Sequence, residues 1–268
     1  MNTENSQKSN NVITVKNLVA HYGERKILNK VSMSVKDGEI MIVMGGSGSG
    51  KSTILRHMLA LETPTSGHIS LLGQDLTTCN YNKLQNLRRK MGVAFQGGAL
   101  FGSLTVGENV MLPLREHTNL DEKTMKIMSR MKLEVVNLAG FEDLMPSELS
   151  GGMIKRVALA RAIVMDPKLL FFDEPSAGLD PVAAVELDEL ILQLRTAMNM
   201  TIVVVTHELE SAYKIADRIT VLDQGDILIS NAVEIVKNSD NERIQDLLHR
   251  RARKENTDHE TYLNRLTH

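Results

Sequence analysis

IMIVMGGSGSGKST, residues 40–53, is the stretch of sequence that decides the fold of this chain. Its apolar first part is too short for a helix and holds no polar residue, which predicts a strand buried on both faces of a parallel sheet. The part from Gly45 to Ser52 fits the phosphate-loop pattern G-x-x-x-x-G-K-[ST]. Apolar residues then recur at helical spacing, at Ile54, Leu55, Met58 and Leu59. The stretch therefore predicts a strand, an anion-binding loop and a helix in succession.

The phosphate loop has the residue types that phosphate binding requires. Glycines let backbone N–H groups turn inward around an anion, and the following helix adds the positive end of its dipole. Lys51 supplies a charge for the β- and γ-phosphates, and the Ser52 hydroxyl is placed to ligate Mg²⁺. A Gly/Ser-rich turn with a solvated lysine is the alternative, but the strand-loop-helix context argues against it. The nucleotide-binding residues we expect are Gly45, Gly46, Ser47, Gly48, Ser49, Gly50, Lys51, Ser52 and Thr53.

Composition narrows the class of protein. With 268 residues, 42% of them apolar, the chain can bury the core of one large domain or of two small ones. A formal net charge of -2 gives no electrostatic reason to expect a nucleic-acid partner. The single cysteine, Cys79, fits a reducing compartment, so we expect a cytoplasmic protein. The polar residues 1–11 predict a disordered tail, and no apolar run reaches the roughly 20 residues that span a bilayer, so a membrane role would need a partner.

Strand and helix patterns alternate along the rest of the chain. Residues 12–38 alternate as in antiparallel strands, and short strands are expected at 68–72 and at 91–95, the latter ending in Gln96. Residues 105–149 read as a helical insertion interrupted at Pro113, Gly140 and Pro146. Within it, a stripe of Met125, Met128, Met131 and Val135 indicates either core packing or a protein-docking face.

Three polar segments follow apolar runs or open helices. Leu149-Ser150-Gly151-Gly152-Met153 is a second glycine-rich helix start, suited to an anion. Asp173-Glu174 follows the apolar run 169–172, and His207 ends the strand pattern of 202–206. A solvated turn pair is the alternative for the two acids, but the apolar run predicts a buried strand that delivers them to the ligand-binding edge of an α/β sheet.

These motifs, in this order, resemble the nucleotide-binding subunit of an ABC transporter. The likeness covers about residues 12–230 and rests on the phosphate loop, Gln96, the segment 149–153, Asp173-Glu174, the segment 176–180 and His207. It implies an α/β fold, a P-loop NTPase ABC cassette with an antiparallel β subdomain, a helical subdomain at about 97–160 and a C-terminal helical tail. We therefore expect an ATPase domain at 12–237, preceded by the tail 1–11 and followed by a tail at 238–268.

The resemblance also implies roles for single residues. On local pattern alone Tyr22 reads as a half-buried strand-end aromatic, whereas the family places an adenine-stacking aromatic there. Mg²⁺ would be held by Ser52, Gln96 and Asp173. Glu174 would be the general base, with Gln96 near the attacking water and His207 at the γ-phosphate, which is coherent chemistry for ATP hydrolysis.

A homodimer is implied as well. The signature, which we define as Ser150, Gly151, Gly152 and Met153, would close over the ATP held by the other subunit, with Asp180 as the D-loop residue beside it. Two departures from the family pattern stand out: the usual LSGGQ ends in Met153, and Gly46 replaces a common proline. Neither removes a phosphate donor, so we expect ATP binding to be kept and the signature's contact to ribose to differ.

Shorter strings narrow the resemblance to the ATPases of the Mla lipid-asymmetry system and their chloroplast lipid-import relatives. They are the signature ending in methionine, residues 96–101, residues 108–110 and residues 113–116. This likeness implies phospholipid as cargo and integral permease subunits as partners, with a small accessory regulator and a periplasmic lipid-binding subunit beside them. The chain would then sit at the cytoplasmic side of the bacterial inner membrane, peripheral through the permease.

Two other functions stay open. The ATPase of an importer for amino acids, metals or another small solute would share every catalytic motif. A non-transport ABC protein is a different class, but such proteins generally carry two cassettes or a long coiled coil, and this chain has one cassette and no sustained heptads. A purely structural nucleotide-binding module would be expected to lack Glu174 or His207.

The segment 238–268 has three interpretations. It is a solvated chain end, a basic helix on anionic lipid, or a tail that docks on the other ATPase subunit. We favour the docking tail, with Ile244, Leu247 and Leu248 as its anchor and Tyr262, Leu263 and Leu266 as a second contact.

Overall fold

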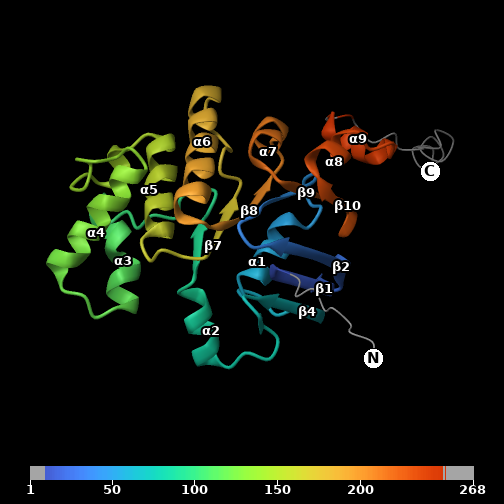
Figure 1. Ribbon diagram of the computed structural model, residues 1–268, viewed down its shortest axis with the longest axis horizontal. Helices are drawn as coiled ribbons and strands as arrows, with labels where there is room; N and C mark the ends of the chain where they lie inside the picture. The colour runs from blue at the N-terminus through green and yellow to red at the C-terminus, as the bar shows by residue number, and fades with distance from the viewer. Residues whose placement is uncertain (1–9, 250, 252–268) are drawn as a thin grey trace, which may run out of the picture.

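The computed structural model, which describes residues 10–249 and 251, contains two β-sheets (Figure 1). The larger sheet has the order β10-β9-β3-β8-β7-β6, and every neighbouring pair is parallel except β10 and β9. Its strands are β3 (Ile40–Met44), β6 (Met91–Ala94), β7 (Leu169–Asp173), β8 (Thr201–Thr206), β9 (Arg218–Asp223) and β10 (Asp226–Ala232). Because the central strands are parallel, the loops that follow β3, β6, β7 and β8 emerge at one edge of the sheet.

Strand β3 shows why this sheet is central. All five of its residues are buried, as the unbroken apolar run predicts for a strand covered on both faces. Ile40, Ile42 and Met44 join one hydrophobic core, whereas Met41 and Val43 join the other. The alternation follows from the period of two along a strand, so the sheet separates two cores.

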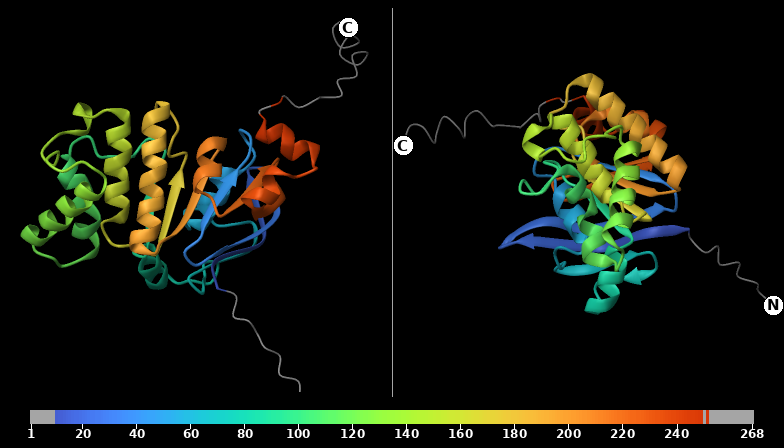
Figure 2. Two further views of the ribbon diagram at one scale, coloured as in Figure 1. Left: turned by 45° about the horizontal axis from the view of Figure 1, so that its top comes forward. Right: turned by 90° about the vertical axis from the view of Figure 1, so that its left-hand side faces the viewer.

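The smaller sheet covers the side of the molecule opposite the helices α3 to α5 (Figure 2). It has the order β2-β1-β4-β5, from β1 (Asn11–Tyr22), β2 (Arg25–Lys36), β4 (Ser66–Leu71) and β5 (Gln74–Asp75). All three pairings are antiparallel, which confirms the predicted antiparallel β subdomain. Asn11 already pairs with Lys36, so the strand begins inside the range expected to be a tail, and residues 1–9 lie outside the described residues.

The helices complete the α/β fold. They are α1 (Lys51–Met58), α2 (Tyr81–Arg88), α3 (Val106–His117), α4 (Glu122–Val135), α5 (Gly151–Ile163), α6 (Pro181–Met198), α7 (Leu209–Ile215), α8 (Val233–Lys237), α9 (Glu242–Leu248) and the 3-10 turn η1 (Pro146–Glu148). Helices α3, α4 and α5 gather at one end of the molecule, away from β1 and β2 (Figures 1 and 2). Within the described part of the chain, no helix has both the length and the apolar character needed to cross a bilayer.

The packing of side chains explains two sequence patterns in the helical insertion. Pro113 lies inside α3 and does not interrupt it, because Val110, Met111 and Leu114 bury this helix and the proline removes a single backbone donor. The methionine stripe of α4 divides: Met125 is buried, while Met131 and Val135 are exposed. Only the first part of that stripe is core.

The predicted dimer anchor in the C-terminal segment is wrong in part. Ile244 and Leu248 of α9 are buried in the core of their own chain, together with Val236 of α8. Arg243 fixes α9 to the end of β9, with Nε 2.7 Å and Nη2 3.0 Å from the two carboxylate oxygens of Asp223. Ile244 and Leu248 therefore pack within their own subunit. Tyr262, Leu263 and Leu266 lie outside the described residues.

Candidate functional site

The phosphate loop joins the buried end of β3 to the first turn of α1. Gly45 has to be glycine because a Cβ there would lie 2.0 Å from the Leu222 carbonyl oxygen. Gly50 adopts a φ of 105°, which L side chains rarely take, and it caps α1. The sequence thus makes a tight loop whose only large side chain at the helix start is Lys51.

Lys51 is held against its own loop. Its Nζ donates to the carbonyl oxygens of Gly45 at 2.9 Å and Gly46 at 3.0 Å. Burial lowers the pKa of this ammonium, and the Glu174 and Asp173 carboxylates act in the opposite direction. The Lys51 ammonium lies at the N-terminus of α1, where the helix also favours negative charge. This position suits an anionic ligand.

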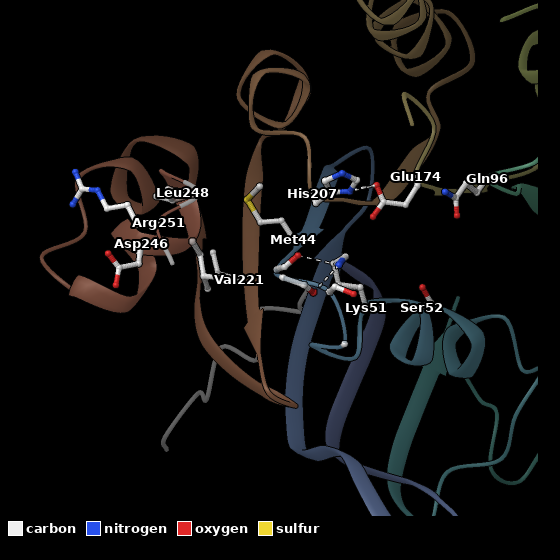
Figure 3. Close-up of a pocket in the computed structure, with 15 residues that line it drawn as sticks. Met44, Lys51, Ser52, Gln96, Glu174, His207, Val221, Asp246, Leu248 and Arg251 are labelled. Carbon is white, nitrogen blue, oxygen red and sulfur yellow. Dashed lines mark hydrogen bonds and ion pairs between the residues drawn. The ribbon is translucent and has the colours of Figure 1, made fainter. Parts of the chain in front are cut away.

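Two adjacent carboxylates at the end of β7 have different surroundings. The Asp173 Oδ1 atom is buried and has no hydrogen-bond partner. Burial raises the pKa of Asp173, and the neighbouring Glu174 raises it further. Glu174 has a φ of 50° and its N–H donates to Val205. Its Oε2 lies 2.8 Å from His207 Nδ1 and accepts the His207 backbone N–H at 3.3 Å (Figure 3).

A cavity of about 780 Å³ brings these segments together. Residues predicted for the site that line it are Gly45, Gly46, Ser47, Gly48, Lys51, Ser52, Gln96, Glu174 and His207. Figure 3 shows Lys51 and Ser52 on the phosphate loop and α1, with Gln96, Glu174 and His207 arriving from other strand ends. These predicted residues therefore come from the segments after β3, β6, β7 and β8, as expected for an open α/β sheet.

Other predicted residues lie outside the wall of this cavity. Ser49, Gly50 and Thr53 belong to the same loop and helix, and Asp173 is the last residue of β7, just before Glu174. Tyr22 ends β1 with 66% of its surface exposed, so it is not the half-buried aromatic that its local pattern indicates. An exposed ring at the end of a strand remains available for stacking.

The signature is also separate from the cavity of its own chain. Ser150 is exposed and caps α5 by accepting the Met153 N–H at 3.3 Å. Met153 lines a different hollow of about 480 Å³, together with Phe141 and Leu190. Asp180 caps α6, accepting the N–H groups of Val182 and Ala183. The methionine therefore belongs to the packing between α5 and α6 in this chain.

The oxygen atoms at this site fit an Mg²⁺ ion that takes most of its other ligands from a nucleotide. No group of three or more His, Cys, Asp or Glu side chains suited to a metal occurs in the residues described. Mg²⁺ needs no such cage, since it is commonly bound by one or two carboxylates, water and phosphate oxygens. Asp173 offers a buried oxygen that has no other partner, and Ser52 and Gln96 add oxygens at the cavity wall.

Sequence reasoning missed some residues around this site. Asp246, Leu247, Leu248 and Arg251 of the C-terminal segment also line the cavity. Figure 3 shows Asp246, Leu248 and Arg251 on the side opposite Gln96. Lys155 and Arg161 of α5 donate to backbone carbonyls of the loops after β7 and β6. The helical spacing of Ile244, Leu247 and Leu248 is a signal for α9. Helix charges such as Lys155 resemble solvated ones in the sequence, so they leave no comparable signal.

A protein-family model described as ABC transporter matches residues 28–177. The chain belongs to the ABC transporter family. It is an ATP hydrolase of that family, and its cavity joins the phosphate loop to Gln96, Glu174 and His207.

Relatives of this ABC ATPase are similar over most of its length. The intermembrane phospholipid transport system ATP-binding protein MlaF of Haemophilus influenzae is 41% identical over 238 residues, covering 89% of this chain and 90% of that protein. A probable ribonucleotide transport ATP-binding protein of Mycobacterium leprae is 37% identical, over 89% of this chain and 69% of its own length. A solved dimeric structure of the ATP-binding cassette MJ0796, in a post-hydrolysis state with ADP and Pi, has 31% identity and a TM-score of 0.76, covering 82% of this chain and 98% of that one. These likenesses confirm the predicted α/β ABC cassette.

Proposed function

We propose that this ABC ATPase drives phospholipid transport between the inner and outer membranes of a bacterium. The observation that carries the proposal is the 41% identity to a protein named for intermembrane phospholipid transport, which extends over 90% of that protein. The relative named for ribonucleotide transport supports a second candidate cargo, but this chain spans 69% of its length at 37% identity. Phospholipid is therefore the cargo that we favour.

ATP would lie with its phosphates in the loop Gly45–Thr53. The inward backbone N–H groups and Lys51 would hold the β- and γ-phosphates, and the exposed ring of Tyr22 would stack on adenine. Mg²⁺, with Ser52, Gln96 and Asp173 as its protein ligands, would neutralise phosphate charge.

Glu174 is the residue that we assign as general base. It lines the cavity, and its carboxylate is oriented by His207 at 2.8 Å. A base has to take a proton from water within hydrogen-bond reach of the γ-phosphate, and Glu174 reaches the cavity from the end of β7, which β8 separates from the phosphate-loop strand β3. His207 would in turn contact the γ-phosphate, and Gln96 would sense the nucleotide from the opposite wall.

A symmetric dimer explains the position of the signature. Ser150 and the exposed Gly151 lie away from their own cavity at a helix N-terminus, with open space around the Gly151 Cα. In a two-fold dimer such a helix start can face the phosphates held by the partner. The solved cassette of similar fold is itself dimeric. Each ATP would then be bound by the phosphate loop of one subunit and by the signature of the other.

A groove beside Gln96 is the surface that we assign to the permease. It has a volume of about 400 Å³ and runs between β6, the loop after it and α3. Phe95 and Phe101 line it with 39% and 54% of their surfaces exposed. Apolar rings around a groove suit a helix from a membrane partner, which would fix the ATPase to the cytoplasmic side of the inner membrane. A small accessory regulator and a periplasmic lipid-binding subunit would complete the system.

The test is reconstitution of the chain with its membrane partner in liposomes. Labelled phospholipid should move only with ATP, and Glu174→Gln should lower both turnover and lipid movement by about 10²- to 10⁴-fold while ATP still binds. Movement of ribonucleotide in place of lipid would contradict the cargo. Hydrolysis by the variant within a few-fold of the parent would contradict the role of Glu174.

A further inference from the structure

Lys155 of α5 holds the backbone of the segment that carries Glu174. A lysine ammonium has three N–H donors. Here the carbonyl oxygens of Glu174, Pro175 and Ala177 lie 3.3, 2.5 and 2.6 Å from Lys155 Nζ. Burial lowers the pKa of Lys155, while the Glu174 carboxylate raises it. One side chain thus ties together the backbone from residue 174 to residue 177.

This segment needs external support. Glu174 has a φ of 50°, in the left-handed region that residues other than glycine seldom occupy. Such a conformation persists when the surroundings fix it. The Glu174 N–H is fixed by Val205 and its carboxylate by His207, and its carbonyl accepts both the Lys155 ammonium and the Ala177 N–H, each at 3.3 Å. Without Lys155 only the hydrogen bond from Ala177, within the same turn, would hold that carbonyl, so the turn would lose its tie to α5 and the carboxylate would shift relative to Lys51.

The same lysine belongs to the signature helix. Ser150 caps α5, and the helix runs without a break from Gly151 to Ile163. Lys155 lies in its second turn, at a distance over which a helix moves as a rigid rod. A displacement of the signature is therefore passed to the carbonyls of residues 174–177.

We propose that Lys155 is a positioning residue that links the signature in one ATP site of the dimer to the general base in the other site. The inference rests on the proposed function, in which the signature faces the partner's ATP and Glu174 acts on the ATP of its own subunit. When the signature closes on the partner's nucleotide, α5 and Lys155 set the 174–177 backbone so that Glu174 reaches its water. Nucleotide bound in one site thereby changes the position of the general base in the other site.

Substitutions in the full chain, purified with its membrane partner, test the positioning role. Lys155→Met keeps the unbranched chain as far as Cε and removes the donors, so kcat should fall by about 10²-fold, as for other small displacements of a reacting group. The Kd for ATP and the melting temperature should stay close to those of the parent. Lys155→Arg should restore most of the turnover because guanidinium also donates several hydrogen bonds. Lys126→Met is the matched control, since Lys126 is an exposed lysine that pairs with Glu122 on the surface of α4. An unchanged kcat, or a loss matched by weaker ATP binding, would overturn the proposal.

Mixed dimers identify which site Lys155 serves. With Lys155→Met and Glu174→Gln in one subunit and a parent partner, both lesions concern the same base, so the rate should equal that of a dimer with Glu174→Gln alone. With the two substitutions in opposite subunits, both bases are impaired and the rate should fall about 10²-fold further. Equal rates for the two arrangements, or the reverse order, would overturn the link. A fully active Glu174→Gln homodimer would instead refute the proposed function itself.

Discussion

Asp173 and Glu174 are neighbours in sequence, yet the fold gives the two carboxylates different environments. Glu174 is engaged by His207 and, through its carbonyl, by Lys155. Asp173 keeps a buried oxygen without a partner, and burial raises its pKa. A group whose charged form is disfavoured by folding reduces stability wherever that group is ionised. Asp173 therefore costs stability that a bound cation would recover.

Asp173→Asn should consequently raise the melting temperature of the chain at neutral pH. The folded pKa of Asp173 lies above its unfolded value of 3.8, so the ionised carboxylate destabilises the fold at pH values above the raised pKa. The difference between variant and parent should shrink as pH falls through the raised pKa towards 3.8, because the carboxyl becomes protonated in both states. Thermal melts across this pH range measure it.

Thermal melts of the parent and the variant with ATP and Mg²⁺ test whether Asp173 helps to hold the cation. The parent should gain stability from Mg²⁺ beyond that from ATP alone, and the variant should lose this gain. A lower melting temperature for Asp173→Asn at neutral pH would contradict the account of the orphaned oxygen.

At the scale of single residues, the sequence could predict the groups that end buried strands. Gln96, Glu174 and His207 each follow an apolar run, and parallel strands bring such ends to one edge. Lys155 could not be predicted in this way, because a lysine on a helix is usually solvated and the carbonyls that it binds belong to another segment. A local sequence pattern does not predict a role that depends on contacts with the backbone of a distant segment.

At the scale of elements, α9 is the clearest difference between expectation and structure. Its apolar residues were expected to reach another subunit, but the hairpin β9–β10 and α8 return the chain to its own core. Leu247 lies close enough to Gly46 that a Cβ there would be 3.8 Å from it. Periodicity predicts that a helix has an apolar face, and it cannot say which core receives that face.

A chain that ends after Asn238 should therefore be less stable. It loses the burial of Ile244 and Leu248 and the fork between Arg243 and Asp223. Two buried aliphatic side chains correspond to a loss of about 3–6 kcal/mol in the free energy of unfolding, as an upper estimate. Urea denaturation measures the loss. A chain that ends after Arg251 keeps every one of these contacts and is the matched control. Equal stability of the two truncated chains would show that α9 does not belong to the core.

At the scale of the whole molecule, the architecture follows from a few patterns. The phosphate loop fixes β3 and α1, and the order of the apolar runs predicts a parallel sheet with an antiparallel sheet and helices beside it. One subunit alone lacks the complete ATP site that the proposed function requires, because Ser150 lies outside the cavity that holds Lys51. The central claim is that two chains share each site.

A mixed dimer of Ser150→Arg and Lys51→Ala subunits, assembled with the membrane partner, tests this claim most directly. Each homodimer should be inactive, because Ser150→Arg places bulk against the partner's γ-phosphate and Lys51→Ala removes the charge that binds phosphate. In the mixed dimer both lesions fall in one composite site, so the other site is intact and ATP hydrolysis should return, up to about half of the parent rate. If the mixed dimer is as inactive as both homodimers, or if isolated monomers hydrolyse ATP at the parent rate, the sites are not shared between two chains.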